Sequence, residues 1–307
     1  MTKFSIDVGI IGAGLAGLTC ARYLRREGFT VSLFDKSRGI GGRLATRRIR
    51  AGDRDIRVDH GLPFLTIQGE RTRFFIQNLL TENLVHAIDD RFYPCPDGMN
   101  SIAKFLAREL EIRREFLVTR MIPTGDFWSI EGKEGESVTA RAIVLAIPAP
   151  QAVTLLQASN LSNFLPELNS IEYDPCITVI AGYADSLPIP LLSADFRHIG
   201  AYENRTVFVL QSGADLSAKY LDSEDLEAVT GEIIARSGLP SPAWSQIHRW
   251  RYAVPRRGSG VACLHSIDPL PLVACGDWCL EGDPERAIET ALTSGESAAI
   301  EIQRFLT

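Results

Sequence analysis

A glycine-rich stretch near the N-terminus has the residue types and the spacing that a bound dinucleotide requires. Residues 12–17 read Gly-Ala-Gly-Leu-Ala-Gly and follow an apolar run. In this pattern the first glycine permits a tight turn, the second lets the backbone approach a pyrophosphate, and the third lets a helix pack closely on the preceding strand. The free N–H groups at the start of that helix favour an anion. We therefore expect the pyrophosphate to lie against Gly12, Ala13, Gly14, Leu15, Ala16 and Gly17.

An acid and a second pair of glycines follow. Asp35 ends the next apolar segment, where a carboxylate accepts hydrogen bonds from ribose hydroxyls, and an acid there favours FAD or NAD over NADP. We expect Asp35 and the adjacent Lys36 to contact the cofactor. Gly41, Gly42 and Arg43 come next, and glycine N–H groups with a bidentate guanidinium would hold a diphosphate from its other side, which favours FAD over NAD. The alternative interpretation of the glycine pair is a plain turn.

The apolar pattern predicts the elements that position these residues. Residues 6–11 read as a buried strand, 15–26 as a helix and 29–34 as a second strand, which together make one βαβ unit. Residues 45–61 predict a hairpin with its turn at the Gly/Asp cluster, and residues 96–111 predict an amphipathic helix.

The whole chain predicts an α/β fold, with a Rossmann-type FAD-binding domain and an interleaved α+β substrate domain. Residues 270–278 again read as a buried strand, followed by a terminal helix, like the elements of the N-terminal third, whereas the middle of the chain holds many prolines and short strands. We expect the FAD-binding domain to comprise residues 1–65, 96–150 and 267–307, and the substrate domain to comprise residues 66–95 and 151–266.

Composition excludes several classes of partner. The formal net charge of −6 over 307 residues argues against binding to nucleic acid or to an anionic membrane. No apolar run is long enough for a membrane span, and the N-terminus lacks the features of a signal peptide, so a cytoplasmic protein is expected. The six cysteines are spaced irregularly, which predicts reduced thiols and no metal site.

Several motifs together resemble one family. The segments GAGLAG, LFDKSRG, GGR, VDHGLPFLT, PDGMNSIAKFLA, HRWRYAVP, VACGDW and TSGESAA are similar to those of the renalase-like branch of the flavin-containing amine oxidase superfamily. The resemblance covers nearly the full length and is most specific through residue 43 and at GDW. It implies non-covalent FAD at the domain interface and oxidation of dihydronicotinamide compounds, with O2 as electron acceptor.

The resemblance also implies cofactor contacts beyond the glycine loops. Val118 matches a residue whose backbone pairs with adenine, and Asp277 matches an acid near the ribityl chain and phosphate. Ile288 matches a residue whose N–H faces the flavin C2 carbonyl, and Gly61 and Leu62 match flavin contacts. The chain departs from the family at 287–291, where Ala-Ile-Glu-Thr-Ala stands in place of Arg-Val-Glu-Gly-Ala.

Two segments carry candidates for catalysis and substrate binding. His60 and His248 are candidate proton-transfer residues, although a histidine beside a glycine is also typical of a structural role. Arg249, Trp250 and Arg251 are candidates for substrate binding, with the arginines holding phosphates. Strand alternation sends His248 and Trp250 to one face and the arginines to the other. The face that carries His248 and Trp250 either lines the substrate site or forms an aromatic core.

Three functions remain open at this point. They are a dihydronicotinamide oxidase of the renalase type, an oxidase of an amine or another small molecule, and a non-catalytic flavoprotein that acts as a sensor or scaffold. Amine oxidases of the superfamily place a lysine near the flavin, and none of the five lysines of this chain falls in an apolar strand of the middle segment. This favours the first function. The run of arginines between 47 and 57 reads as a solvated hairpin face.

Overall fold

The βαβ unit that the apolar pattern predicts opens the fold. In the computed structural model, which describes residues 5–51, 54–89, 91–280 and 283–307, β1 (Ser5–Ile11) leads through α1 (Leu15–Arg26) into β2 (Val31–Asp35). Strand β1 pairs in parallel with β2 on one side and with β8 (Ser137–Leu145) on the other. Helices cover both faces of such a sheet, which explains why these strands are continuous apolar runs.

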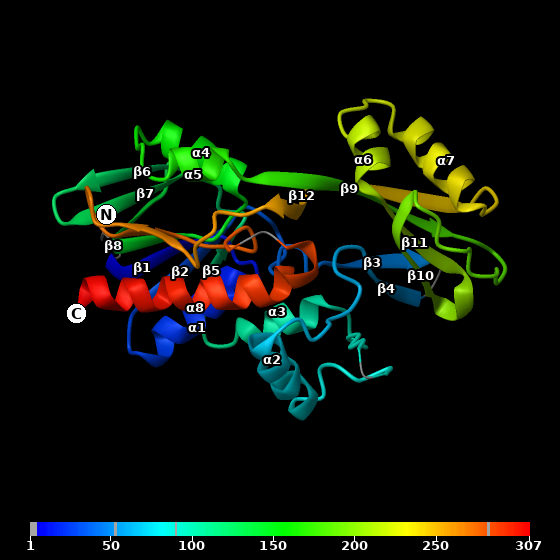
Figure 1. Cartoon of the computed structure of the whole chain (residues 1–307), viewed down its shortest axis with the longest axis horizontal. Helices are drawn as coiled ribbons and strands as arrows, with labels where there is room; N and C mark the ends of the chain where they lie inside the picture. Colours follow the sequence, from blue (N-terminus) through cyan, green and yellow to red (C-terminus); the bar gives the residue numbers. More distant parts are fainter. Residues whose placement is uncertain (1–4, 52–53, 90, 281–282) are drawn as a thin grey trace.

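These strands belong to an eight-stranded sheet with the order β13-β14-β8-β1-β2-β5, to which β7 and β6 are added beside β8. The remaining strands of the sheet are β5 (Glu111–Arg114), β6 (Val118–Thr124), β7 (Phe127–Gly132), β13 (Leu264–Ser266) and β14 (Leu272–Ala274). Figure 1 shows helices on both sides of it. One side carries α1, α2 (Glu70–Thr81), α3 (Asn100–Leu106) and α8 (Ala287–Leu306), and the other carries α4 (Ala149–Ala158) and α5 (Leu165–Asn169). The fold class expected from the sequence is confirmed.

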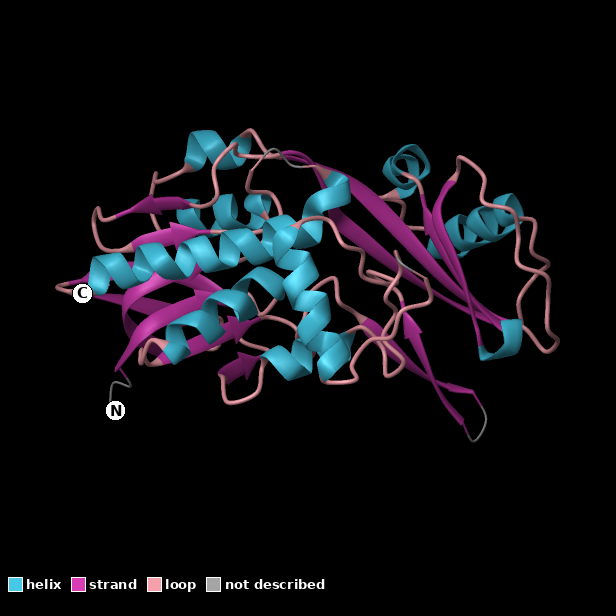
Figure 2. Ribbon diagram, turned by 60° about the horizontal axis from the view of Figure 1, so that its bottom comes forward, coloured by secondary structure: helices cyan, strands magenta, loops and turns pink. Residues whose placement is uncertain are grey.

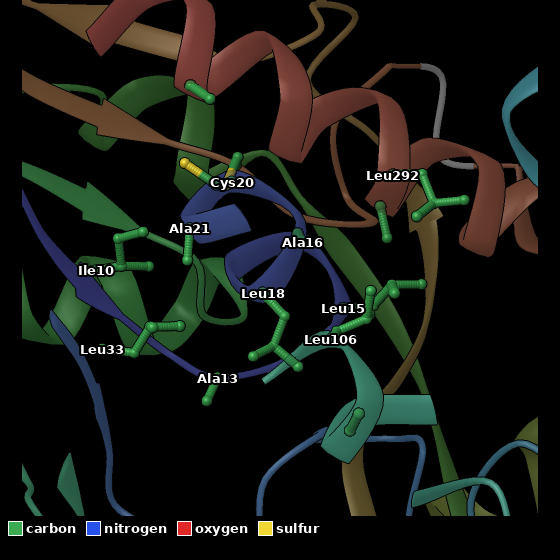
Figure 3. Close-up of a cluster of buried hydrophobic side chains, with 14 of the residues drawn as sticks. Ile10, Ala13, Leu15, Ala16, Leu18, Cys20, Ala21, Leu33, Leu106 and Leu292 are labelled. Atoms are coloured by element: carbon green, nitrogen blue, oxygen red, sulfur yellow. The ribbon is translucent and has the colours of Figure 1, made fainter. Parts of the chain in front are cut away.

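The principal core lies between this sheet and the helices α1, α3 and α8. Figure 3 shows Leu18 of α1 between strand residues Ile10 and Leu33 and helix residues Leu106 and Leu292. All five side chains are buried, and burial of each large aliphatic chain contributes about 1.5 to 3 kcal/mol before the cost of ordering it. The core therefore holds α1 rigidly behind the glycine turn that precedes it.

A second sheet extends from this half of the molecule. It has the order β10-β11-β9-β12, and its members are β9 (Glu172–Gly182), β10 (Phe196–Tyr202), β11 (Val207–Ser212) and β12 (Trp244–Arg257). The long strands β9 and β12 run from the larger half into this sheet, as the long magenta arrows of Figure 2 show. Short 3-10 helices follow β10, at Glu203–Arg205, and precede α8, at Pro284–Arg286.

The two faces of the second sheet are covered differently. Helices α6 (Ala214–Tyr220) and α7 (Leu226–Ser237) pack on one face, over Ile177, Val179 and Leu210. The hairpin β3 (Thr46–Ala51) and β4 (Arg54–Asp59) packs on the other face, where Ile49, Ile56 and Val58 meet Ile180, Val207 and Val209. Strand alternation thus gives each face its own core.

Three expectations need adjustment. The helix expected over 96–111 is only seven residues long, because the chain turns at 107–110 and then adds β5 as an edge strand beside β2. Residues 66–95, expected in the substrate domain, instead share the core of α1 through Ile76, Leu79 and Val85. Residues 151–171 likewise pack on the eight-stranded sheet. We therefore propose a smaller substrate domain, centred on the four-stranded sheet. No helix in the described part of the chain is long and apolar enough to cross a membrane.

Candidate functional site

Two glycine turns lie against each other at the carboxyl ends of β1 and β2. Gly12 and Gly41 adopt positive φ angles of 107° and 103°, which side-chain-bearing residues rarely adopt. The Gly41 N–H donates to the Ala13 carbonyl at 2.8 Å, and Gly14 forms an isolated parallel bridge with Gly41. The second glycine pair is therefore more than a plain turn, because it packs directly on the first.

The space beside these turns fits a diphosphate. A Cβ atom built on Gly14 would meet no atom of the described residues within 4 Å, and one on Gly42 would meet only the Gly14 Cα, at 3.7 Å. A Cβ on Gly17, by contrast, would lie 2.1 Å from the Gly12 carbonyl oxygen. Gly17 is thus required by helix packing, whereas Gly14 and Gly42 leave room for a ligand. We call the surface formed by Gly12–Gly17 and Gly41–Gly42 the glycine cradle.

Asp35 stands at the edge of this cradle. One carboxylate oxygen accepts the Ala13 N–H at 2.9 Å and the other accepts the Ser37 N–H at 2.8 Å. Each oxygen keeps a further acceptor position for a hydroxyl. The Phe116 N–H donates to the Asp35 carbonyl, which brings the start of β6, and with it Val118, next to the acid. Lys36 is exposed beside them. The residues expected around adenosine are therefore adjacent.

Arg43 is held by the C-terminal part of the chain. Its guanidinium forms a bidentate pair with Asp277, with Nη2 2.6 Å from Oδ1, and Nη1 also donates to the Ala253 carbonyl of β12 at 2.9 Å. Asp277 is 6% exposed and Arg43 34%. Burial acts to lower the pKa of Arg43, but the charge and hydrogen bonds of Asp277 outweigh it and raise that pKa. Both residues expected near the diphosphate thus lie together.

Ile288 has a partner that the sequence analysis missed. Its N–H and that of Glu289 both donate to the side-chain oxygen of Gln68, at 3.0 and 3.1 Å. The Glu289 carboxylate in turn accepts the N–H groups of Arg71 and Thr72 at the start of α2. The starts of α2 and α8 thus cap each other. In this arrangement the Ile288 N–H is directed at an amide carbonyl.

His60, Gly61 and Leu62 connect the cradle to the second sheet. The Leu62 N–H donates to the Arg43 carbonyl at 2.8 Å, and a Cβ on Gly61 would clash with that same oxygen. From the other side, Trp250 Nε1 donates to the His60 carbonyl at 3.0 Å, and Gln211 Nε2 donates to the Gly61 carbonyl. These backbone groups leave little freedom in the segment that is expected to contact the flavin.

A row of four polar side chains crosses the face of the second sheet that lies opposite His60. The strand register pairs His198 with Gln211, Gln211 with Thr178, and Thr178 with His248. We call these four residues the polar row. Thr178 is fully buried and Gln211 is 5% exposed. Only the strand register shows that these four residues are neighbours. One indication of a polar site here is visible in the sequence, because Thr178 and Gln211 are polar residues within apolar strands.

The imidazoles of this region are neutral. The rings of His60 and His248 have centroids 5.2 Å apart, and the Trp250 ring lies 4.2 Å from that of His248. Burial lowers the pKa of His60 to about 3; the positive charge of Arg47 acts in the same direction, and so would a proton on His248. Burial and Arg47 also lower the pKa of His248. The Nδ1 atom of His60 is buried and has no hydrogen-bond partner among the described residues.

Trp250 and the two arginines lie on opposite faces of β12, as strand alternation predicts. Arg249 pairs in register with Ile177, on the helix-covered face, and donates to the Leu221 and Ser223 carbonyls. Arg251 forms an ion pair with Asp222. Both arginines therefore bind the segment after α6 and point away from Trp250.

Comparison with known proteins agrees with this geometry. Residues 10–79 match the family model described as an NAD(P)-binding Rossmann-like domain, and residues 76–303 match the one described as flavin containing amine oxidoreductase. The flavin-containing monooxygenase FMO GS-OX1 of Arabidopsis thaliana is 27% identical over 272 residues, which are 78% of this chain and 53% of that protein. FMO GS-OX5 of the same plant is 24% identical over 86% of this chain and 54% of its own length. The chain thus spans about half the length of these curated relatives.

Two solved structures share the fold. A putative protoporphyrinogen oxidase from an Exiguobacterium species aligns with a TM-score of 0.66 and 15% identity, covering 98% of this chain and 100% of that one. Cyclohexylamine oxidase from Brevibacterium oxydans aligns with a TM-score of 0.66 and 13% identity, covering 97% and 100%. At these identities the likeness concerns the fold alone.

The cradle geometry predicts that Gly14→Val folds but does not retain FAD. The side chain would enter open space, so the unfolding midpoint should stay near that of the wild type, while the branched carbons would displace the diphosphate. Gly231→Val in α7, also in open space, is the matched control and should purify yellow. The measurement is flavin absorbance of the purified protein and of the supernatant after acid precipitation. Flavin retained by Gly14→Val, or left in the wild-type pellet, would contradict the non-covalent cradle.

The neutral His60 predicts an acid-dependent stability. The unfolded chain, with a histidine pKa near 6.5, takes up a proton before the folded one does, at about 3. The free energy of unfolding should therefore fall as the pH drops below 6.5, by about 1.4 kcal/mol per unit at most, and level off near pH 3. In urea titrations at several pH values, His60→Leu should show a shallower fall than the wild type. His86→Leu, which removes an exposed imidazole, should keep the wild-type slope, and equal slopes in all three proteins would refute the assignment.

Proposed function

The chain belongs to the flavin-containing amine oxidoreductase family, and we propose that within it the protein is a renalase-like oxidase of dihydronicotinamide compounds. Family membership makes it an FAD-dependent oxidoreductase. What we propose beyond family membership is the class of electron donor and the use of O2 as the electron acceptor. The observation that carries it is the cluster of neutral His60, neutral His248 and Trp250 beside the segment 60–62.

When bound, FAD supplies the redox chemistry, since it accepts a hydride from an organic donor and passes two electrons to O2, which yields H2O2. The residues of this chain would bind FAD and orient its flavin ring. Gly14 and Gly42 would lie against the diphosphate, and Asp35 near the ribose. Gly61 and Leu62 would lie against the flavin ring, held in place by Trp250 and Gln211.

Neutral imidazoles suit a donor that needs no proton removed. An alkylamine reaches an enzyme mostly as an ammonium ion, so its oxidation calls for a base that is strong enough to accept a proton. A group with a pKa of about 3, such as His60, is a poor base near neutral pH. A dihydronicotinamide ring arrives uncharged and releases a hydride without prior deprotonation. The histidines and Trp250 then act as flat surfaces that orient the ring.

The distribution of lysines supports the same choice. In the amine oxidases that this chain resembles, a lysine lies near the flavin. The four lysines in the described residues are all exposed, on the loop after β2, on α3, on the turn after β7 and on α6; they are Lys36, Lys104, Lys133 and Lys219. None of these side chains belongs to the polar row. Lys3 lies outside the described residues.

The proposal predicts which donors reduce the flavin. On anaerobic mixing in a stopped-flow instrument, the 2- and 6-dihydro isomers of NADH should bleach the flavin at least about tenfold faster than ordinary 4-dihydro NADH, because orientation of the hydride-bearing carbon decides the rate. Benzylamine and cyclohexylamine should leave the flavin oxidised. Admission of O2 should restore the colour with one H2O2 formed per donor oxidised.

Two results would contradict the proposal. Reduction by either amine faster than by every dihydronicotinamide would favour an amine oxidase. Failure of all donors to reduce a fully loaded protein would favour a non-catalytic flavoprotein. The first result would also require a base other than His60, which a bell-shaped pH profile of the reduction rate would reveal.

A further inference from the structure

Arg47 differs from the other arginines of the hairpin. It shares its strand face with Ile49, which packs on the second sheet, so its side chain points toward β12 and is half-buried. Its Nη1 donates to the side-chain oxygen of Gln246 at 2.9 Å. Arg48, the next residue along β3, points the other way and is exposed. The hairpin is therefore not a uniformly solvated face.

The guanidinium of Arg47 pairs with no carboxylate in the described part of the chain. Among the residues that the structure describes, no acid lies within 4.0 Å of it, whereas Arg43 and Arg57 each pair with an aspartate. A half-buried cation normally has an anionic partner, because burial without one is costly. Gln246 occupies one nitrogen of the fork and leaves the other donors for a further acceptor.

Arg47 acts on the proposed substrate site. Gln246 and His248 lie on the same face of β12, two residues apart, and Arg47 contacts the first. Its positive charge reaches both His60 and His248 strongly enough to help lower their pKa values. A ligand lying over the half-buried rings of His248 and Trp250 would therefore meet a positive field and an unsaturated set of hydrogen-bond donors.

We propose that Arg47 is a specificity-determining residue that binds an oxyanion, phosphate or carboxylate, carried by the electron donor. The planar guanidinium presents parallel N–H groups that match such an anion, and Gln246 fixes its orientation. The same charge repels ammonium ions. This inference rests on the proposed function, because it assigns the anionic group of the donor whose ring is proposed to lie over His248 and Trp250.

The test compares two ligands that share a ring and differ in charge. The oxidised compounds nicotinamide mononucleotide and nicotinamide riboside are titrated into the FAD-loaded protein, and binding is followed by the perturbation of the flavin spectrum. The wild type should bind the mononucleotide at least about tenfold more tightly, as expected for a charge-assisted hydrogen bond. Arg47→Gln should bring the ratio close to one, by weakening the mononucleotide and by removing the repulsion of the cationic riboside.

Arg48→Gln is the matched control, since it removes the same charge from the neighbouring position on the opposite face. It should keep the wild-type ratio. An unchanged ratio in Arg47→Gln, or an equal loss in both variants, would overturn the proposal, the latter because it would indicate only a diffuse field. Arg47→Lys should retain part of the preference, because an ammonium keeps the charge without the fork.

A second ligand pair separates this inference from the proposed function. Benzoate and benzamide have the same contrast in charge but no nicotinamide. If no dihydronicotinamide reduces the flavin, a benzoate preference that Arg47→Gln removes and Arg48→Gln retains would still support the anion-binding role. If the wild type prefers the anion in neither pair, the role of Arg47 is refuted whatever the donor is.

Discussion

The bidentate pair between Arg43 and Asp277 is the constraint on which the arrangement of this molecule depends. It joins three segments that are far apart in the chain, because the same guanidinium also binds the Ala253 carbonyl of β12. Asp277 is almost fully buried, so the carboxylate would be costly without its partner. The raised pKa of Arg43 expresses the same preference for the paired, charged state.

The Arg43–Asp277 ion pair positions the glycine cradle relative to the four-stranded sheet. On one side Arg43 continues from Gly42, so the cradle is fixed to the end of β14 through the Gly-Asp-Trp segment, where Trp278 Nε1 donates to the Ile147 carbonyl. On the other side β12 continues from Ala253 back to Trp250, which binds the His60 carbonyl. The glycine cradle and the four-stranded sheet are thus connected through one ion pair and through hydrogen bonds from side chains to backbone carbonyls.

The sequence was sufficient where function depends on residues close together in the chain. The turn at Gly12, the close packing at Gly17 and the acid at the end of β2 follow from spacing within some thirty residues, and the fold class follows from them. It was insufficient where function depends on strand register. Thr178 and Gln211 become neighbours only when β9 and β11 pair, and only the pairing of Arg249 with Ile177 shows that the arginines take the face covered by α6 and α7.

Two further differences have the same origin. Arg47 reads as one of several solvated arginines until Ile49 is seen to pack on the second sheet. Gln68 carries no motif, yet the packing of α2 against α8 makes it the cap of the terminal helix. Residues 52–53, within the Gly/Asp cluster where the turn of the 45–61 hairpin is expected, lie outside the described residues. In segments without a recognisable motif, contacts between residues far apart in the chain thus decide which polar side chains, such as those of Arg47 and Gln68, face the candidate site.

The most direct test of the account is a double-mutant cycle on the central ion pair. In urea unfolding of the FAD-free proteins, Arg43→Met and Asp277→Leu should each lower the free energy of unfolding by about 2 kcal/mol or more, and the double variant should regain most of that loss, because two apolar side chains can replace a buried pair. Titration with FAD should show weak binding in all three variants. Single variants as stable as the wild type, or a double variant that binds FAD with wild-type affinity, would contradict the claim that this pair joins the glycine cradle to the four-stranded sheet.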